Sequence, residues 1–373
     1  MKNILITGGA GFIGSAIANR LITLEYNVTI FDNLSSKIHN NRDAYNNLKN
    51  KTNFIIGDVN VRKDWENAIL DQDAIIHLAS ETGTGESMYD IYNYVNTNIS
   101  ATALMLDVLT NSQHNIKKLI LSSSRSIYGE GKYLCAKHGD IYPLERDLKQ
   151  LGNKYFDFIC PHCDSPIKEV ATDEKSLINP LSIYAISKLN QEQMILLIGK
   201  YLNINTTVLR FQNVYGPGQS LSNPYTGILS IFSTRILNNN NIEIYEDGNE
   251  SRDFIYIDDV VEASFLSLVD DKNSGQVFNV GTGKQVSVLD VARKLKSIFK
   301  SNINIEITGK FRIGDIRHNF ADISKINNYL GFSPKFSFDE GLFKFASWVK
   351  TQEIHDDKYS ESISKLEDKG LIK

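Results

Sequence analysis

The 373-residue sequence has few cysteines, no surplus of positive charge and no long apolar run. Its net charge is −4 with both signs interspersed, which argues against nucleic acid or a membrane surface as partner, because both need a basic face. No apolar stretch reaches the ~18 residues of a membrane-spanning helix. Glycines break the N-terminus MKNILITGGAGFIG too early for a signal-peptide core. We therefore expect a cytoplasmic protein without paired disulfides.

Short apolar runs alternate with longer amphipathic stretches over residues 1–212. The runs are rich in Ile, Leu and Val and end in small or polar residues, as buried strands do, and they span 3–8, 27–33, 53–59, 74–80, 118–124 and 206–212. Helical patterns lie between them, for example at 12–26 and 100–112. This alternation predicts an α/β fold with a Rossmann-type doubly wound parallel sheet, whose ligands bind at the carboxyl ends of the strands.

The pattern changes after residue 212, where turn-rich stretches alternate with shorter elements. We expect a smaller α/β lobe made of 213–253 and 281–350, with 254–280 returning to the first domain. The last stretch, 351–373, is polar, which is typical of a surface helix or a frayed tail.

A glycine-rich loop, TGGAGFIGS, follows the first predicted strand and opens the first helix. Gly8, Gly11 and Gly14 permit a tight turn, a close approach of the backbone to a pyrophosphate, and close helix packing. Asp32 ends the second strand, where a carboxylate accepts hydrogen bonds from the adenosine ribose and repels a 2′-phosphate. The alternative for Asp32 is a turn residue. The context favours NAD over NADP as cofactor.

A second motif, YAISK, places Tyr184 and Lys188 on one face of a predicted helix. A neighbouring ammonium favours the phenolate, so Tyr184 is expected to have a lowered pKa and to act as a base. Ser124, at the end of the fifth strand, can bond the same substrate oxygen. Alone, a Tyr and Lys four residues apart also fit a solvated helix; the glycine loop and Ser124 make the set specific.

With these motifs the sequence resembles the extended short-chain dehydrogenase/reductase family, which contains nucleotide-sugar epimerases and dehydratases. The resemblance covers about 1–350 and rests on GGAGFIGS, FDNL, GDV, HLAS, SSSRSIYGE, YAISK, RFQNVYGPGQ, ESRDFIYIDDV, FNVGTG and IGDIRHNFADISK. It implies an NAD site made of Gly8, Gly11, Phe12, Ile13, Gly14, Asp32, Asn33, Asp58, Val59, Leu78, Ala79, Ser80, Asn98, Ser122, Tyr184, Lys188 and Phe211.

The resemblance also implies a nucleotide-diphosphate sugar as the substrate partner. Asn213, Arg252 and Arg317 would hold its diphosphate, since arginine makes bidentate contacts to phosphate oxygens. The alternative for either arginine is a surface salt bridge. Ser124 would face the sugar, and Thr82 and Glu86 would either bind its hydroxyls or cap the next helix.

The residues after Ser124 decide the expected reaction. Related dehydratases have Asp and Glu there, whereas this sequence has Arg125 and Ser126, which disfavours 4,6-dehydration. The expected activity is that of an NAD-dependent 4-epimerase. Hydride passes from C4 to NAD as Tyr184 takes the hydroxyl proton, the 4-keto sugar turns about its diphosphate, and hydride returns to the other face.

Two alternatives to the 4-epimerase remain: an NADPH-using 4-ketoreductase, and an NAD-binding protein without catalysis. A homodimer is the family expectation.

The three cysteines lie in an insertion at about 131–172, between Ser124 and Tyr184, where the family has a shorter connection. The order C-x2-H…C-x2-C is typical of a small structural zinc site, with ligands Cys135, His138, Cys160 and Cys163. A segment this short has little core, so a metal would stabilise it. The alternatives are a redox pair, three unrelated thiols, or His162 in place of His138. The insertion also resembles a subgroup related to dTDP-L-rhamnose 4-epimerases.

Overall fold

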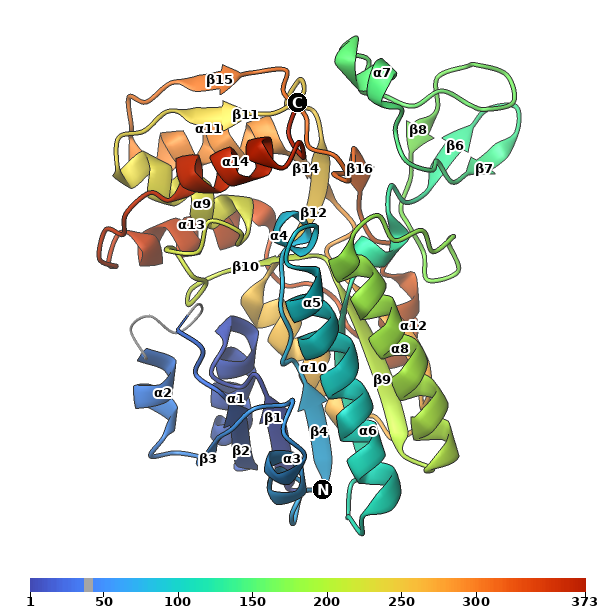
Figure 1. Cartoon of the computed structure of the whole chain (residues 1–373), viewed down its shortest axis with the longest axis vertical. Coiled ribbons are helices and arrows are strands. Elements are labelled where there is room, and N and C mark those ends of the chain that lie inside the picture. The colour runs from blue at the N-terminus through green and yellow to red at the C-terminus, as the bar shows by residue number, and fades with distance from the viewer. Residues whose placement is uncertain (37–42) are drawn as a thin grey trace.

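The computed structural model describes residues 1–36 and 43–373. Its centre is a seven-stranded parallel sheet in the order β13-β9-β5-β4-β1-β2-β3 (Figure 1). The strands are β1 (Asn3–Thr7), β2 (Asn27–Asp32), β3 (Asn53–Ile56), β4 (Ala74–His77), β5 (Lys118–Ser124), β9 (Asn205–Phe211) and β13 (Gln276–Val280). The chain winds one way from β1 and the other way from β4. The predicted doubly wound sheet is therefore confirmed, and its ligand crevice is expected at the β1–β4 switch point.

Helices cover both faces of this sheet. On one face α1 (Phe12–Thr23) packs against α10 (Ile257–Val269), and on the other lie α3 (Arg62–Ala68), α6 (Ala101–Asn111) and α8 (Ile183–Tyr201). A π-helical segment, Val95–Ser100, leads into α6. The central strands are buried on both faces, which is why their sequences are nearly continuous apolar runs.

A second lobe lies beyond the carboxyl ends of the strands (Figure 1). It contains a mixed sheet of β10 (Asn213–Tyr215), β12 (Ser251–Tyr256), β14 (Gln285–Ser287) and β16 (His318–Asn319), and a parallel pair, β11 (Ile242–Ile244) and β15 (Ile305–Ile307). Its helices are α9 (Ile228–Leu237), α11 (Val288–Phe299) and α13 (Phe338–Val349). Shorter helices elsewhere are α2 (Asp43–Leu48), α4 (Thr84–Ser87), α5 (Ile91–Tyr94) and α12 (Ser324–Leu330).

The polar C-terminal stretch is more ordered than a tail. It forms α14 (Tyr359–Asp368), whose Leu366 is buried, and a final extended segment that pairs with the chain around residue 312. The Phe311 N–H donates to the Lys373 carbonyl at 2.9 Å, and the Lys373 N–H donates back at 3.0 Å. Of the two expectations for this polar stretch, a surface helix or a frayed tail, the structure shows the helix.

The insertion projects beside the second lobe as a small unit (Figure 1). Three short antiparallel strands, β6 (Tyr133–Cys135), β7 (Gly139–Ile141) and β8 (Lys168–Glu169), are accompanied by α7 (Leu148–Gly152). One cluster of buried side chains within it consists of Tyr133, Cys135, Ile141 and Cys160. None of the helices in the described ranges is both long and apolar enough to cross a membrane.

Candidate active site

A cavity of about 1000 Å³ lies between the carboxyl ends of the sheet strands and the second lobe. It extends from the glycine loop to Tyr184 and on to β12 and α14. Most residues predicted for the cofactor and substrate line it, namely Gly8, Gly11, Phe12, Ile13, Gly14, Asp32, Asn33, Val59, Leu78, Ala79, Ser80, Thr82, Ser122, Ser124, Tyr184, Lys188, Phe211, Asn213 and Arg252. The fold therefore brings predicted residues from separate segments of the chain together around one cavity.

The glycine loop has the geometry that a pyrophosphate needs. Gly8 has φ +65°, and a Cβ on Gly14 would lie 2.3 Å from the Gly8 carbonyl oxygen, so neither position accepts a side chain without strain. The Asp32 carboxylate accepts hydrogen bonds from the backbone N–H groups of Ala10 at 3.0 Å and Leu34 at 2.9 Å. These bonds tie the loop to the end of β2. A carboxylate has further lone pairs, so Asp32 can still accept from a ribose hydroxyl.

Tyr184 and Lys188 lie on α8, which begins after the N-cap Ser182. The Lys188 ammonium donates to the Ser122 carbonyl at 3.0 Å and lies 6.0 Å from the centre of the Tyr184 ring. Burial lowers the pKa of Lys188 to about 7. Burial raises the pKa of Tyr184, while a hydrogen bond with Ser124 and the positive charge of Arg125 oppose that rise.

This electrostatic picture differs from the sequence expectation that Lys188 lowers the pKa of Tyr184. Desolvation of the phenol is the larger effect, and the Lys188 nitrogen lies 6.0 Å from the ring centre, with its own pKa lowered by burial. The groups that favour the phenolate are Ser124 and Arg125, which follow each other at the end of β5. Arg125 was named in the sequence only as a departure from the dehydratase motif.

A buried ion pair fixes the helix that carries these residues. The Arg210 guanidinium, on β9, donates from Nε to Glu192 Oε1 at 3.0 Å and from Nη2 to Oε2 at 2.7 Å. Ser123, at the end of β5, donates to the same carboxylate. Glu192 is one turn beyond Lys188 on α8, so this pair sets the position of Tyr184 and Lys188 relative to β5. Neither residue belongs to a motif that would have revealed it in the sequence.

Cationic side chains gather at the lobe end of the cavity. Arg125 Nε donates to Asn213 Oδ1 at 3.2 Å, and its two terminal nitrogens have no hydrogen-bond partner in the described ranges. Arg252 donates from Nη2 to Asp315 Oδ1 at 3.1 Å, and Arg312 pairs with Oδ2 of the same carboxylate at 3.3 Å. All three arginines line the cavity. The cavity lining here also contains the carboxylates of Glu243, Glu246 and Glu250, and the guanidinium groups are the side chains suited to a diphosphate.

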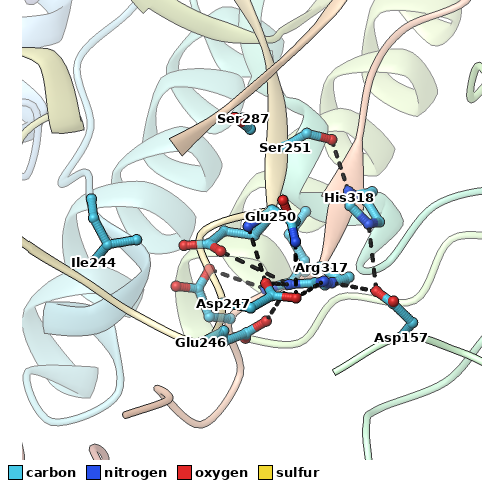
Figure 2. A network of polar contacts seen from close by, with 12 residues as sticks. Asp157, Ile244, Glu246, Asp247, Glu250, Ser251, Ser287, Arg317 and His318 are labelled. Carbon is cyan, nitrogen blue, oxygen red and sulfur yellow. Dashed lines mark hydrogen bonds and ion pairs between the residues drawn. The ribbon is translucent and has the colours of Figure 1, made fainter. Parts of the chain in front are cut away.

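Arg317, predicted to hold the diphosphate, lies outside the cavity and has a different role (Figure 2). Its side chain is only 1% exposed, and its guanidinium pairs with Asp247 at 2.7 Å, Asp157 at 2.8 Å and Glu246 at 3.0 Å. The prediction for Arg317 is wrong because these carboxylates, distant in the sequence, occupy its donors. Arg312, five residues earlier, has the cavity position, and the sequence analysis missed it.

Three other predicted residues also lie behind the cavity wall. Asn98 accepts from the Glu81 N–H at 2.8 Å and donates to Ser187 Oγ at 2.9 Å, so it joins the loop after β4 to α8. Asp58 Oδ1 accepts from the Asn60 N–H at 2.8 Å, and Glu86 is buried within α4 beside Tyr94. None of the three lines the cavity. The polar groups of Asn98 and Glu86 face protein, whereas Asp58, half-buried between the cavity residues Gly57 and Val59, stays a prediction as a cofactor contact.

The Cys/His residues of the insertion converge as their spacing predicted. One potential ligand atom from each of Cys135, His138, Cys160 and Cys163 lies within 4.8 Å of the others. Cys135 Sγ is 3.8 Å from Cys163 Sγ, and His138 Nδ1 is 3.6 Å and 3.4 Å from Cys135 Sγ and Cys160 Sγ. Tetrahedral zinc, with Zn–S of about 2.3 Å and Zn–N of about 2.0 Å, separates its ligand atoms by roughly 3.5–3.8 Å. The four side chains fit that ion.

The redox alternative fits this geometry poorly. Cys160 and Cys163 lie in a tight turn, in which the Cys160 N–H donates to the Ser165 carbonyl at 2.8 Å. A redox pair of the disulfide-oxidoreductase kind requires a helix N-terminus to stabilise its thiolate, and Cys160 and Cys163 precede no helix until α8 begins at Ile183. His162 is outside the four-residue cluster, with its ring centre 5.2 Å from that of His138.

Comparison with known proteins agrees with this geometry. The sequence profile of the NAD dependent epimerase/dehydratase family matches residues 4–149 and 158–281. The chain belongs to this family. The unmatched residues between the two segments, 150–157, lie in the insertion. The family resemblance seen in the sequence is therefore confirmed.

Relatives within the epimerase/dehydratase family extend over nearly the whole chain. A dTDP-L-rhamnose 4-epimerase of Burkholderia thailandensis is 35% identical over 351 residues, 93% of this chain and 95% of that protein. A crystal structure of UDP-glucose 4-epimerase with UDP-glucose, from Thermotoga maritima, has a TM-score of 0.76 at 29% identity and covers 93% of this chain and 98% of that one. UDP-glucuronic acid 4-epimerase from Bacillus cereus, in complex with UDP-glucuronic acid and NAD, has a TM-score of 0.75 at 27% identity, covering 93% and 99%.

Proposed function

We propose that this protein is an NAD-dependent nucleotide-sugar 4-epimerase. The observation that carries the proposal is the single cavity that joins the glycine loop and Asp32 to Tyr184, Ser124 and the arginines of the second lobe. The glycine loop and Asp32 would hold the pyrophosphate and adenosine ribose of NAD. When bound, NAD accepts hydride from a substrate carbon and can return it.

The chain's own residues supply proton transfer and orientation. Tyr184 Oη would take the proton from the sugar hydroxyl during oxidation and give it back during reduction, with Ser124 bonding the same oxygen. Lys188 donates a hydrogen bond to the Ser122 carbonyl, which holds its side chain in the cavity wall beside Tyr184 and Ser124. Positions 125 and 126 carry Arg and Ser where related dehydratases have carboxylates, which supports epimerisation over dehydration.

The charge distribution supports turning of the sugar within the cavity. Arg252, Arg312 and Asn213 would hold the diphosphate at the lobe end, by charge-assisted hydrogen bonds. The Thr82 end of the cavity offers hydroxyl groups and the Glu81 carboxylate to the sugar. A ligand held at its diphosphate can present either face of the sugar to the same hydride donor.

The proposal is tested by supplying purified protein with dTDP-L-rhamnose, UDP-glucose and UDP-glucuronate without added cofactor. The product is identified by NMR at C4. We expect interconversion of at least one 4-epimer pair with no net cofactor consumption. Stoichiometric oxidation of NADPH with a 4-keto substrate would instead indicate a ketoreductase. Absence of turnover on the whole panel by NAD-loaded protein would reject catalysis of this kind.

Arg125 is expected to control the pH dependence of the reaction. Its charge lowers the pKa of Tyr184, so replacing it by serine removes a stabiliser of the phenolate. The base form of Tyr184 is lost as pH falls, and in Arg125→Ser that loss should begin at a higher pH. The measurement is the pH profile of kcat/KM. An acid limb in Arg125→Ser that coincides with that of the unmodified protein would contradict this role.

We also propose that the insertion binds structural zinc through Cys135, His138, Cys160 and Cys163. The support is the tetrahedral spacing of their ligand atoms. Elemental analysis of purified protein should give about one zinc per chain. Purified protein that contains no zinc and whose thiols titrate readily would contradict the zinc site.

A homodimer is the proposed assembly. Helices α5 and α8 expose large apolar side chains, with Tyr92 82%, Tyr201 78% and Leu197 69% exposed. Apolar side chains on adjacent helices are suited to a second copy of the chain. Light scattering of the purified protein measures the assembly directly.

A further inference from the structure

The insertion contacts the segment that carries Arg312, one of the three arginines that line the cavity. This segment, residues 311–317, contains Arg312 and Asp315 and ends at the buried Arg317. On its other side it supports Arg252, whose Nη2 donates to the Ile316 carbonyl at 2.7 Å and whose Nη1 donates to the Arg317 carbonyl at 3.0 Å. We call it the 311–317 loop. The positions of Arg252 and Arg312 therefore depend on this loop.

Arg146 is the first link from the insertion to the loop. Its side chain is buried and pairs with Glu246 at 2.7 Å and Glu130 at 3.2 Å. Its Nη2 donates to the Asp315 carbonyl at 2.9 Å. Burial alone would raise the pKa of Asp315, but the charges of Arg312, Arg252 and Arg146 lower it to about 2. Asp315 is thus an anion shared between the insertion and the cavity.

Asp157 is the second link (Figure 2). Its carboxylate accepts from Arg317 Nε at 2.8 Å and lies 4.0 Å from His318 Nε2. The Arg317 backbone N–H donates to Glu130 Oε2 at 2.6 Å, so the end of the loop is held from both sides. Asp157 belongs to the stretch that the family profile leaves unmatched. This contact is therefore an addition to the family framework.

An apolar contact completes the interface. Leu151 and Phe156 of the insertion form a buried cluster with Phe311, the residue directly before Arg312. Each of the three is at most 6% exposed. Polar and apolar contacts thus fix the loop at its beginning, middle and end.

All the insertion residues that make these contacts lie between two of the Cys/His residues. Arg146, Leu151, Phe156 and Asp157 fall between His138 and Cys160 in the sequence. A metal bound by both residues closes this segment into a loop, which reduces the conformational entropy it loses on ordering. The insertion's own core is too small to do the same, because the buried cluster around the Cys/His residues has four members, two of which are cysteines.

We propose that the metal-closed insertion positions the 311–317 loop, so that loss of the metal weakens binding of a nucleotide diphosphate while NAD binding is retained. This rests on the proposed function, which assigns the diphosphate to Arg252 and Arg312. The glycine loop lies at the opposite end of the cavity and takes part in none of the contacts described above, so the two ligands should respond differently.

The test compares two ligand variants, His138→Ala and Cys163→Ser, with His162→Ala as the matched control. His162 is an exposed histidine in the same turn region but outside the four-residue cluster. Zinc content, NAD binding, and calorimetric affinity for UDP and dTDP are measured on the NAD-loaded, full-length chain. We expect both ligand variants to lose zinc and to bind the preferred nucleotide about tenfold more weakly. His162→Ala should match the unmodified protein.

Asp157→Asn separates positioning from metal loss. It leaves the Cys/His residues intact and removes the charge that faces Arg317, so it should retain zinc and still weaken UDP or dTDP binding. Ligand variants that lose zinc yet bind the nucleotide normally would overturn the proposal, as would an equal loss of NAD binding. Failure of the proposed function is recognised separately, because the unmodified, NAD-loaded protein would then bind neither nucleotide.

Discussion

Replacing Tyr184 by phenylalanine should lower kcat by about 10²–10⁴-fold, the range typical of losing a general acid–base group. The phenol is the only group of the Tyr184 side chain that can exchange a proton, and Ser124 and Arg125 both act on it. The ring itself remains, so packing against Tyr94 is preserved. We expect unchanged NAD binding and a thermal midpoint close to that of the unmodified protein. Turnover is measured by product NMR with the nucleotide sugar at saturation.

Tyr94→Phe is the matched control for this substitution. Tyr94 is fully buried, and its ring lies edge-on to Tyr184 with 6.5 Å between ring centres. Its hydroxyl donates to the Thr82 carbonyl and does not line the cavity. Loss of this hydroxyl should reduce stability slightly and leave most of the turnover. If Tyr184→Phe kept turnover comparable to Tyr94→Phe, proton transfer would have to be assigned to another group.

The catalytic end of the cavity could be predicted because its residues lie in local motifs. The spacing of Gly8, Gly11 and Gly14 after an apolar run determines a turn between a strand and a helix, and four residues on one helix place Tyr184 beside Lys188. Cysteine and histidine ligands separated by two residues are equally local, which is why their convergence was foreseen. In each case residues close together in the sequence can adopt few conformations that are compatible with the motif.

The lobe end could be predicted only in part, because burial there depends on distant partners. Arg312 and Arg317 lie in one stretch, FRIGDIRHN, with similar neighbours. Only the fold brings Asp247, 70 residues earlier, and Asp157, 160 residues earlier, to Arg317. The pKa of Tyr184 was misjudged for a related reason. Its desolvation follows from the protein groups that surround it in the cavity wall, which a helical spacing does not reveal.

The corrected roles of the two arginines lead to opposite expectations for their alanine variants. Arg317→Ala removes the cation that neutralises Asp247 and Glu246 and that Asp157 contacts, and breaking a buried ion pair typically costs about 3–5 kcal/mol. We expect Arg317→Ala to lower the free energy of unfolding by that amount, measured by urea denaturation at neutral pH. Arg317→Lys keeps one positive charge at this position, so it should lower the free energy of unfolding less than Arg317→Ala does.

Arg312→Ala should instead lower the free energy of unfolding less than Arg317→Ala does, because within the described ranges Arg312 pairs with Asp315 alone and that carboxylate keeps Arg252 and Arg146 as cationic neighbours. The loss is expected in KM for the nucleotide sugar, which should rise on the order of 10–100-fold for one charge-assisted phosphate contact. kcat at saturation should change much less. The opposite result would be a stable Arg317→Ala protein with a raised KM and an Arg312→Ala protein with an unchanged KM. Diphosphate binding would then have to be assigned to Arg317, because only contact with the substrate could explain that difference.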